Sequence, residues 1–197
     1  MALSKIDTAG LVADAVDNTI LDLAGNYAFT GTVTGAGGGK VLQVVSTTKT
    51  DTASFSSAST NTFVDLSGLS VSITPSSTSS KILVIYTANV SQSTTATVHL
   101  RLVRDSTAIY VGDQVGSRIQ SSSAFRTAST PYLLENHNLN GSHLDSPATT
   151  SSVTYKLQGT LGATYSGTYY VNRSASDSNS DVGSRTASSI TVMEIQA

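Results

Sequence analysis

The 197-residue chain has no cysteine and no tryptophan, and only 12% of its residues are charged. The absence of cysteine excludes a disulfide-stapled scaffold, a zinc finger, an iron–sulfur protein and a thiol enzyme. The net charge of −2 argues against a general nucleic-acid-binding protein. The sequence has no run of about 18 apolar residues, and its opening MALSKIDTAG lacks the apolar core of a signal peptide. We therefore predict neither membrane insertion nor secretion.

The sequence is rich in small hydroxyl side chains. It contains 33 serines and 28 threonines, about 31% of all positions. Such a composition is typical of a disordered stalk, or of an all-β protein whose strands point hydroxyl groups to solvent. The spacing of the apolar residues decides between these two interpretations.

Composition divides the chain near residue 39. Residues 1–39 contain one lysine and four aspartates and have a net charge of −3, whereas residues 40–197 contain ten basic and nine acidic residues. The glycine-rich stretch 35–39 separates the two parts and has the composition of a flexible hinge. We predict an N-terminal segment over residues 1–39 and a second domain over residues 40–197.

Apolar residues of the N-terminal segment follow a helical spacing first and an extended one after it. A segment this short cannot bury its own apolar side chains, because isolated helices and single extended stretches are marginal in water. We therefore predict that it is covered by symmetry copies or by another protein; the alternative is a disordered tail. The predicted contact residues are Leu11, Val12, Val16, Ile20, Leu23, Tyr27, Phe29 and Val33.

In the second domain the apolar period changes to two, which is typical of strands. Leu69, Val71 and Ile73 alternate with hydroxyl residues, and the continuous apolar run at 81–86 predicts a central strand covered on both faces. About ten such stretches, separated by turn residues, predict an all-β fold, an antiparallel sandwich of the jelly-roll type. The last stretch, 189–195, is expected to be paired and buried.

The search for chemistry finds no phosphate loop, nucleophile elbow, zinc-protease motif or dinucleotide fingerprint. The densest polar segment, residues 134–147, predicts a turn-rich loop. Its residue types suit a plain surface loop, a divalent metal site or a carbohydrate- or receptor-contacting loop. We predict no metal, no cofactor and no catalytic residue. The candidate ligand-binding residues are Asn136, His137, Asn138, Asn140, His143, Asp145 and, as an outward-pointing aromatic, Tyr170.

Five segments carry a family resemblance. They are Ala2–Leu11, Asp22–Val33, Gly39–Val45, Leu66–Val84 and Ser189–Ile195. All five resemble small structural fibre proteins of tailed bacteriophages, especially phages of aquatic bacteria. The resemblance implies a homotrimer whose N-terminal segment docks on another virion protein and whose β-domain projects as a knob. In such a trimer, the mixed strand face of His99, Arg101 and Val103 suits a subunit interface.

We therefore predict a non-enzymatic, trimeric virion fibre protein, made in the host cytoplasm, that adheres to a glycan or protein of the host surface as a tail fibre. One alternative is a capsid-decorating head fibre with a stabilising or weakly adhesive role. Another is a glycan depolymerase, which requires two carboxylates about 5 to 9.5 Å apart in a cleft. No such pair stands out in the sequence.

Overall fold

The computed structural model describes residues 39–58, 61–127, 134–162 and 166–196. Regular structure in these ranges is all β; no helix occurs there that would be able to cross a membrane. The strands are β1 (Val41–Lys49), β2 (Ala53–Ala58), β3 (Val64–Ile73), β4 (Lys81–Gln92), β5 (Thr97–Arg104), β6 (Thr107–Ile109), β7 (Ser123–Arg126), β8 (His137–Asp145), β9 (Val153–Leu161), β10 (Ser166–Val171) and β11 (Ser188–Ile195).

The N-terminal contact predicted above lies outside the described residues. This applies to its helix, its extended stretch and each of its apolar members, and the division of the chain at residue 39 likewise stays a prediction. The residues concerned are Leu11, Val12, Val16, Ile20, Leu23, Tyr27, Phe29 and Val33.

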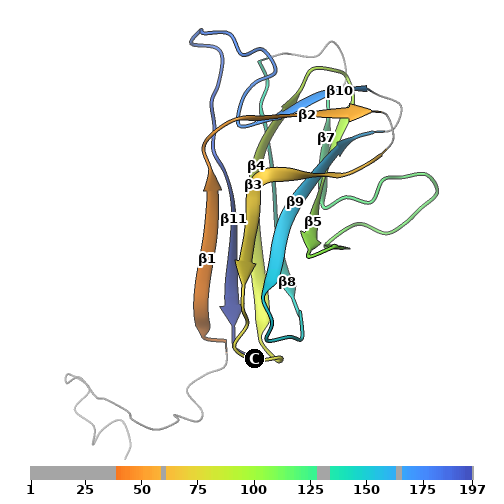
Figure 1. Ribbon diagram of the computed structural model, residues 1–197. Helices are drawn as coiled ribbons and strands as arrows, with labels where there is room; N and C mark the ends of the chain where they lie inside the picture. Colours follow the sequence, from red (N-terminus) through yellow and green to blue (C-terminus); the bar gives the residue numbers. More distant parts are fainter. Residues whose placement is uncertain (1–38, 59–60, 128–133, 163–165, 197) are drawn as a thin grey trace, which may run out of the picture. The chain divides into compact units, whose positions relative to one another are not determined.

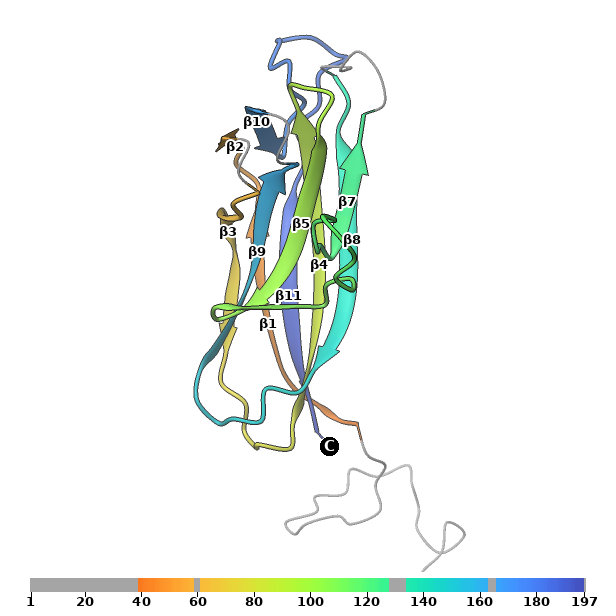
Figure 2. The same ribbon diagram turned by 90° about the vertical axis from the view of Figure 1, so that its right-hand side faces the viewer.

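The strands form two antiparallel sheets that pack face to face (Figures 1 and 2). In sheet A, β1 pairs with β11, and β2 pairs with β10. Both β11 and β10 pair with one side of β4, and β8 pairs with the other side of β4. In sheet B the order is β3, β9 and β5, with β6 and β7 sharing the last position. Three pairs of strands each share one position in a sheet: β1 with β2, β6 with β7, and β10 with β11. If each pair is counted as one strand and the resulting eight strands are renumbered along the chain, the order is 1-8-3-6 in sheet A and 2-7-4-5 in sheet B. These are the orders of a jelly roll, so the predicted fold class is confirmed.

The hydrophobic core lies between the sheets and is built from alternate residues of each strand. The predicted last strand is confirmed, since β11 lies between β1 and β4 and both Ile190 and Val192 are fully buried. Hydroxyl residues occupy many of the positions between the apolar ones, which explains the composition without disorder. Fully buried members of the core include Ile82, Val84, Leu100, Leu102, Tyr155, Leu157, Leu161 and Tyr169.

The run at 81–86 was predicted to be covered on both faces, and this is wrong. Burial alternates along β4, so Ile82, Val84 and Tyr86 point into the core while Ile85 is 40% exposed. Leu83 is half-buried on the same outer side. The outer side of the run at 81–86 therefore presents Leu83 and Ile85, and no described part of the chain covers Ile85 fully.

Residues 137–145, predicted as part of a loop, form the regular strand β8, and this prediction is corrected. All nine residues of β8 pair with β4. Gly141 makes the pairing possible where the Tyr86 ring approaches, because a Cβ at position 141 would lie only 2.7 Å from that ring. The outward asparagine and serine residues are common in turns and rare in strands, so the sequence of β8 predicted a loop.

Hydrogen bonds of Asn172 connect the start of the polar stretch after β10 to the sandwich. Asn172 is fully buried and adopts a φ of +63°, a left-handed conformation in which asparagine is enriched. Its side-chain nitrogen donates to the carbonyl oxygens of Lys49 (2.8 Å) and Asp51 (3.0 Å), and its side-chain oxygen accepts from the Ser188 hydroxyl. The amide therefore joins β10, β11 and the link between β1 and β2.

On sheet B, His99 and Arg101 lie opposite the core face of β5 and are half-buried, and the interface predicted for this face stays a prediction. Val103 is only 1% exposed. Arg101 Nε donates to Gln158 Oε1 (2.8 Å), and its guanidinium lies 4.1 Å from the centroid of the Phe63 ring. His99 is half-buried beside the Ser121 hydroxyl, and burial lowers its pKa. These side chains have partners within the chain.

Candidate functional site

The pleat of β8 separates the predicted ligand-binding residues into two groups. Asn138 and Asn140 point outward from sheet A and are exposed. His137, His143 and Asp145 occupy the alternate positions and point to the other side. A single site that contains all seven predicted residues is therefore excluded by the geometry of the strand.

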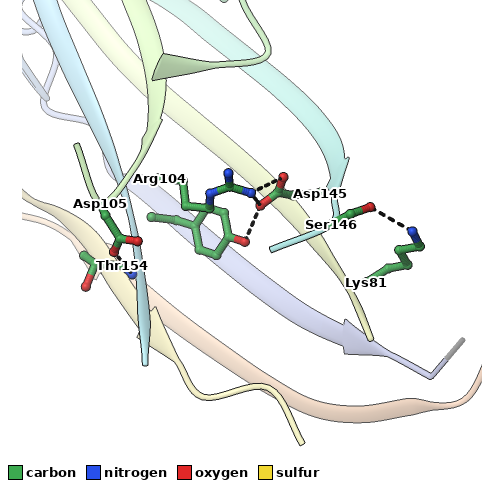
Figure 3. Close-up of polar contacts among 7 residues, drawn as sticks. Lys81, Arg104, Asp105, Asp145, Ser146 and Thr154 are labelled. Carbon is green, nitrogen blue, oxygen red and sulfur yellow. Dashed lines mark hydrogen bonds and ion pairs between the residues drawn. The ribbon is translucent and has the colours of Figure 1, made fainter. Parts of the chain in front are cut away.

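Asp145 belongs to the structural side of β8. It is 7% exposed, and its carboxylate accepts hydrogen bonds from Arg104 Nη1 (2.9 Å to each oxygen) and from the Tyr155 hydroxyl (2.6 Å), as Figure 3 shows. Burial raises the pKa of Tyr155, and the hydrogen bond to Asp145 raises it further, so the phenol stays a donor. Because Arg104 and Tyr155 come from sheet B, this cluster connects the two sheets, and we assign Asp145 to stability rather than to ligand contact.

The two histidines of this segment stack on separate aromatic rings. His137 lies 4.1 Å from the Phe125 ring, centroid to centroid, and its Nε2 is 3.2 Å from a Glu135 carboxylate oxygen. His143 stacks on Tyr110 at 5.3 Å. In the described ranges, no three histidine, aspartate or glutamate side chains converge as a metal site would require.

Asn136 lies just before β8 and is half-buried. Its Nδ2 donates to the Thr186 hydroxyl at 3.2 Å, while its buried Oδ1 has no hydrogen-bond partner among the described residues. The amide therefore faces the segment that leads into β11 and takes no part in the outer face of the sheet.

On the outer face of sheet A, three asparagines form a chain of hydrogen bonds. Asn140 Nδ2 donates to Asn138 Oδ1 (3.1 Å), and Asn138 Nδ2 donates to Asn89 Oδ1 (3.1 Å). Asn89 Nδ2 donates in turn to the carbonyl oxygen of Ala187 (2.6 Å). An amide has two donor hydrogens and two acceptor lone pairs, so these residues are oriented by one another and keep capacity to bond a ligand.

A shallow hollow of about 420 Å³ adjoins this asparagine chain. Tyr110 follows β6 at the edge of sheet B, is exposed and is held at a φ of +52°. Its ring stacks on His143, on the side of β8 opposite to Asn140, so it borders the hollow but does not lie among the outward asparagines. An aromatic ring beside amide and hydroxyl groups can pack on the apolar face of a sugar while its neighbours bond the sugar hydroxyls. The hollow is lined by Ile85, Tyr86, Thr87, Tyr110, Asn140, Gly141 and Ser142.

Sequence reasoning missed Tyr110 as a site residue. The sequence predicts only a strand over Ala108–Val111, and the approach of Tyr110 to β8 is a contact between segments far apart in the chain. The residue pattern around Tyr110 gives no local signal for that contact.

Tyr170 lies on the same outer face, in a row next to the asparagines. It pairs with Ser91 of β4, two residues from the position at which Asn89 pairs with Asn138. The Arg173 guanidinium lies 4.0 Å from the centroid of its ring. The structure thus brings Asn138 and Tyr170, with Asn140, to one face. We call this face, made of Asn89, Asn138, Asn140 and Tyr170 with Tyr110 at its border, the amide face.

No family model and no curated protein matches the chain. Among solved structures, the chain is similar to VP2 in the subviral particle of infectious bursal disease virus, with 13% sequence identity and a TM-score of 0.35. The likeness covers 78% of this chain and 39% of that one, so the chain spans about two fifths of the length of that protein. A likeness of this extent supports no conclusion about function.

Proposed function

We propose that this chain is a non-enzymatic structural protein of a virion, a trimeric tail fibre whose jelly-roll domain contacts the host surface. Within that role, the amide face of sheet A binds a host-surface glycan through its hydroxyl groups. The N-terminal segment attaches the protein to the particle. The resemblance of five sequence segments to phage fibre proteins supports the place on the virion.

The observation that carries the binding role is the ordered asparagine chain beside the hollow at Tyr110. Asn138 and Asn140 are exposed, yet they are fixed in orientation by hydrogen bonds of 3.1 Å. Groups oriented before binding lose less conformational freedom when the ligand arrives. Neutral amides also suit the uncharged hydroxyl groups of a polysaccharide, because they donate and accept without requiring a counter-charge.

An adsorption competition tests this proposal. Purified full-length chain, added to host cells before the virus, is expected to slow virus adsorption, and it should be retained on a column of the host's surface polysaccharide. The double substitution Asn138→Ala with Asn140→Ala should weaken both effects on the order of tenfold, the loss of about 1.4 kcal/mol. The matched control is Asn179→Ala, an exposed asparagine of the loop before β11.

Equal retention of the double variant and the control on the polysaccharide column would show that the amide face does not bind the glycan. Gold-labelled antibody against the chain, applied to intact virions, tests the location separately. Label on tails is expected, whereas label spread over the capsid would assign the chain to capsid decoration instead.

A further inference from the structure

On the outer face of sheet A, a row of apolar side chains runs across the sheet through β1, β11, β4 and β8. The registers align Val44 of β1 with Met193 of β11, Met193 with Leu83 of β4, and Leu83 with Leu144 of β8. Paired residues point to the same side of a sheet, so the four side chains are neighbours. Val44 is 56% exposed and Leu144 is 54% exposed, which leaves both ends of the row open to solvent.

Residues of the two adjoining rows extend this apolar surface. Val41 pairs with Ile195 at the lower end of the sheet in Figure 1, and Ile85 lies between Thr191 and Ser142 on the other side of the row. Val41 and Ile85 are both exposed. We name this surface the apolar end of sheet A; its members are Val41, Val44, Leu83, Ile85, Leu144, Met193 and Ile195.

An antiparallel sheet with a solvated outer face normally carries polar residues there. That rule holds farther along the same strands, where Thr48, Ser189, Thr87 and Asn140 form one row. At the apolar end it is broken on four adjacent strands at once. With strands about 4.8 Å apart, the row spans about 14 Å across the sheet. Contiguous exposed apolar surface of this kind marks an interaction site.

The polar groups next to the apolar end are hydroxyls, and hydroxyls are complementary to themselves. Ser46 Oγ lies 2.8 Å from Thr191 Oγ1, and Ser142 lies across the sheet in the same row. A hydroxyl group both donates and accepts, so an identical surface can satisfy it. A rim with charge of one sign would instead repel its own copy.

Charge also favours a second copy over an anionic partner. Among the outward-pointing residues of the described strands of sheet A, Lys81 is the one charged side chain, and its Nζ is bonded to the Ser146 hydroxyl at 2.8 Å. A nucleic acid or an acidic protein would require several basic groups here. An uncharged apolar centre with a hydroxyl rim fits a second surface of the same kind.

The place where the described chain begins agrees with this occupant. Residues 1–38 precede the described part, and β1 begins at Val41, within the apolar end. The backbone nitrogen of Gln196 donates to the carbonyl oxygen of Lys40 (2.9 Å), which fixes the start of β1 beside the end of β11. Copies that meet at the apolar end therefore bring the starts of their β1 strands together, as attachment of an oligomer at a single point requires.

We propose that the apolar end of sheet A is the surface through which copies of this chain associate. This inference rests on the self-association in the proposed function. It places the contact on sheet A, in place of the face of β5 that the sequence indicated.

Sedimentation equilibrium of the full-length chain tests the inference. The wild type is expected to sediment as an oligomer at micromolar concentration. The double substitution Val44→Glu with Leu144→Glu places a carboxylate at each end of the row and should raise the dissociation constant on the order of a hundredfold or more. Val182→Glu is the matched control, because Val182 is equally exposed but lies in the loop before β11; it should sediment as the wild type does.

The outcomes separate the two proposals. A folded double variant with the wild-type mass would overturn the apolar end as the contact surface and leave the oligomer in place. A wild type that stays monomeric across the concentration range would overturn the trimer, and this inference with it. Circular dichroism shows whether the variant retains its sheets.

A second measurement applies if the double variant does not fold. The chain contains no cysteine, so Leu144→Cys introduces a single thiol at the apolar end. A short bis-maleimide should cross-link this variant into covalent dimers, whereas Val182→Cys should stay uncross-linked at the same concentration. Equal cross-linking of the two variants would contradict the inference.

Discussion

The outer faces of the two sheets differ in how they use polar groups. On sheet B, Asp65 accepts from Lys156 Nζ (2.8 Å) and Gln158 Nε2 (2.6 Å), and Gln158 accepts from Arg101 (2.8 Å). These side chains form one network within the chain. On sheet A, the described strands point a single charged residue outward, Lys81, and the apolar end has no covering side chains of its own.

The difference shows that one fold can build two kinds of surface with the same pleat. Exposed ion pairs such as those of sheet B contribute little to stability, but they use up the groups that would otherwise attract a partner. Sheet A leaves apolar groups exposed, which costs solubility unless another molecule covers them, and its asparagine amides bond one another but keep capacity to bond a ligand. We therefore assign the solvated role to sheet B and the contact roles to sheet A.

Removal of residues 190–197 should have the largest effect, because both faces depend on one core. The deletion takes away six of the eight residues of β11, which lies between β1 and β4, and with them the buried Ile190 and Val192. We expect no cooperative thermal unfolding and an insoluble product. The control deletes only Gln196 and Ala197, which follow the strand. A cooperative melt in the longer deletion would show that the sheets do not depend on this strand.

Substitutions on the two sides of β8 should separate stability from contact. Asp145→Ala removes the acceptor of Arg104 and of the buried Tyr155 hydroxyl, and should lower the free energy of unfolding by about 3 kcal/mol. Asn140→Ala, on the outer side, should cost less than about 1 kcal/mol. Urea denaturation at fixed protein concentration measures both. Similar losses would contradict the division of the strand into a structural and a contact side.

Glu194 should make stability depend on pH in the acid range. Burial alone would raise its pKa, but hydrogen bonds from Ser76, Gln43 and Ser80 outweigh burial and lower it from 4.5 to about 2. The folded protein therefore stabilises the ionised form of Glu194 more than the unfolded chain does. This stabilisation is complete above about pH 4.5 and is lost as the pH falls toward 2.

Glu194→Gln tests that account. At pH 7 it should cost about 1–3 kcal/mol, because an amide nitrogen then faces one of the donors. Melting temperatures of the variant and the wild type should converge as the pH is lowered from 6 to 3, with protein concentration held constant. A constant difference across this range would show that the Glu194 carboxylate does not supply the acid dependence.

The smallest effect is expected on sheet B. Asp65→Ala breaks the exposed network with Lys156 and Gln158 and should cost less than about 1 kcal/mol. It should leave the sedimentation of the chain unchanged, because sheet B is the solvated face. A change of mass with this variant would place a contact on sheet B and remove the contrast between the faces.

Sequence periodicity predicted the sandwich because alternation is a local property. It also flagged the run at 81–86 as covered on both faces, and the outer side of that run, with Leu83 and Ile85, became part of the apolar end. Asn138 and Asn140 were predicted as site residues from their chemistry, and they do lie together on an exposed face.

What the sequence could not predict depends on register and on contacts between distant segments. Val44, Met193 and Leu144 stand in three separate stretches, and only the pairing of β1, β11, β4 and β8 aligns them. The same holds for Asp145, whose partners Arg104 and Tyr155 belong to the other sheet. Residue types near Asp145 suggest a polar loop, and nothing local distinguishes a buried acceptor from an exposed one.

Two matched hydroxyl pairs allow a direct test of the contrast between the faces. Ser46 lies 2.8 Å from Thr191 on the outer face of sheet A, and Ser72 lies 2.8 Å from Thr154 on that of sheet B; both serines are exposed. In the cysteine-free chain, Ser46→Cys and Ser72→Cys each introduce one thiol with a similar neighbour.

The rate of thiol alkylation in the native full-length protein is then the decisive measurement. We expect Ser46→Cys to react about tenfold or more slowly than Ser72→Cys at micromolar concentration, because a covered thiol is not accessible to the reagent. The rates should converge on dilution as the copies separate. Equal rates at every concentration, in a chain that sediments as an oligomer, would contradict the assignment of the contact surface to sheet A.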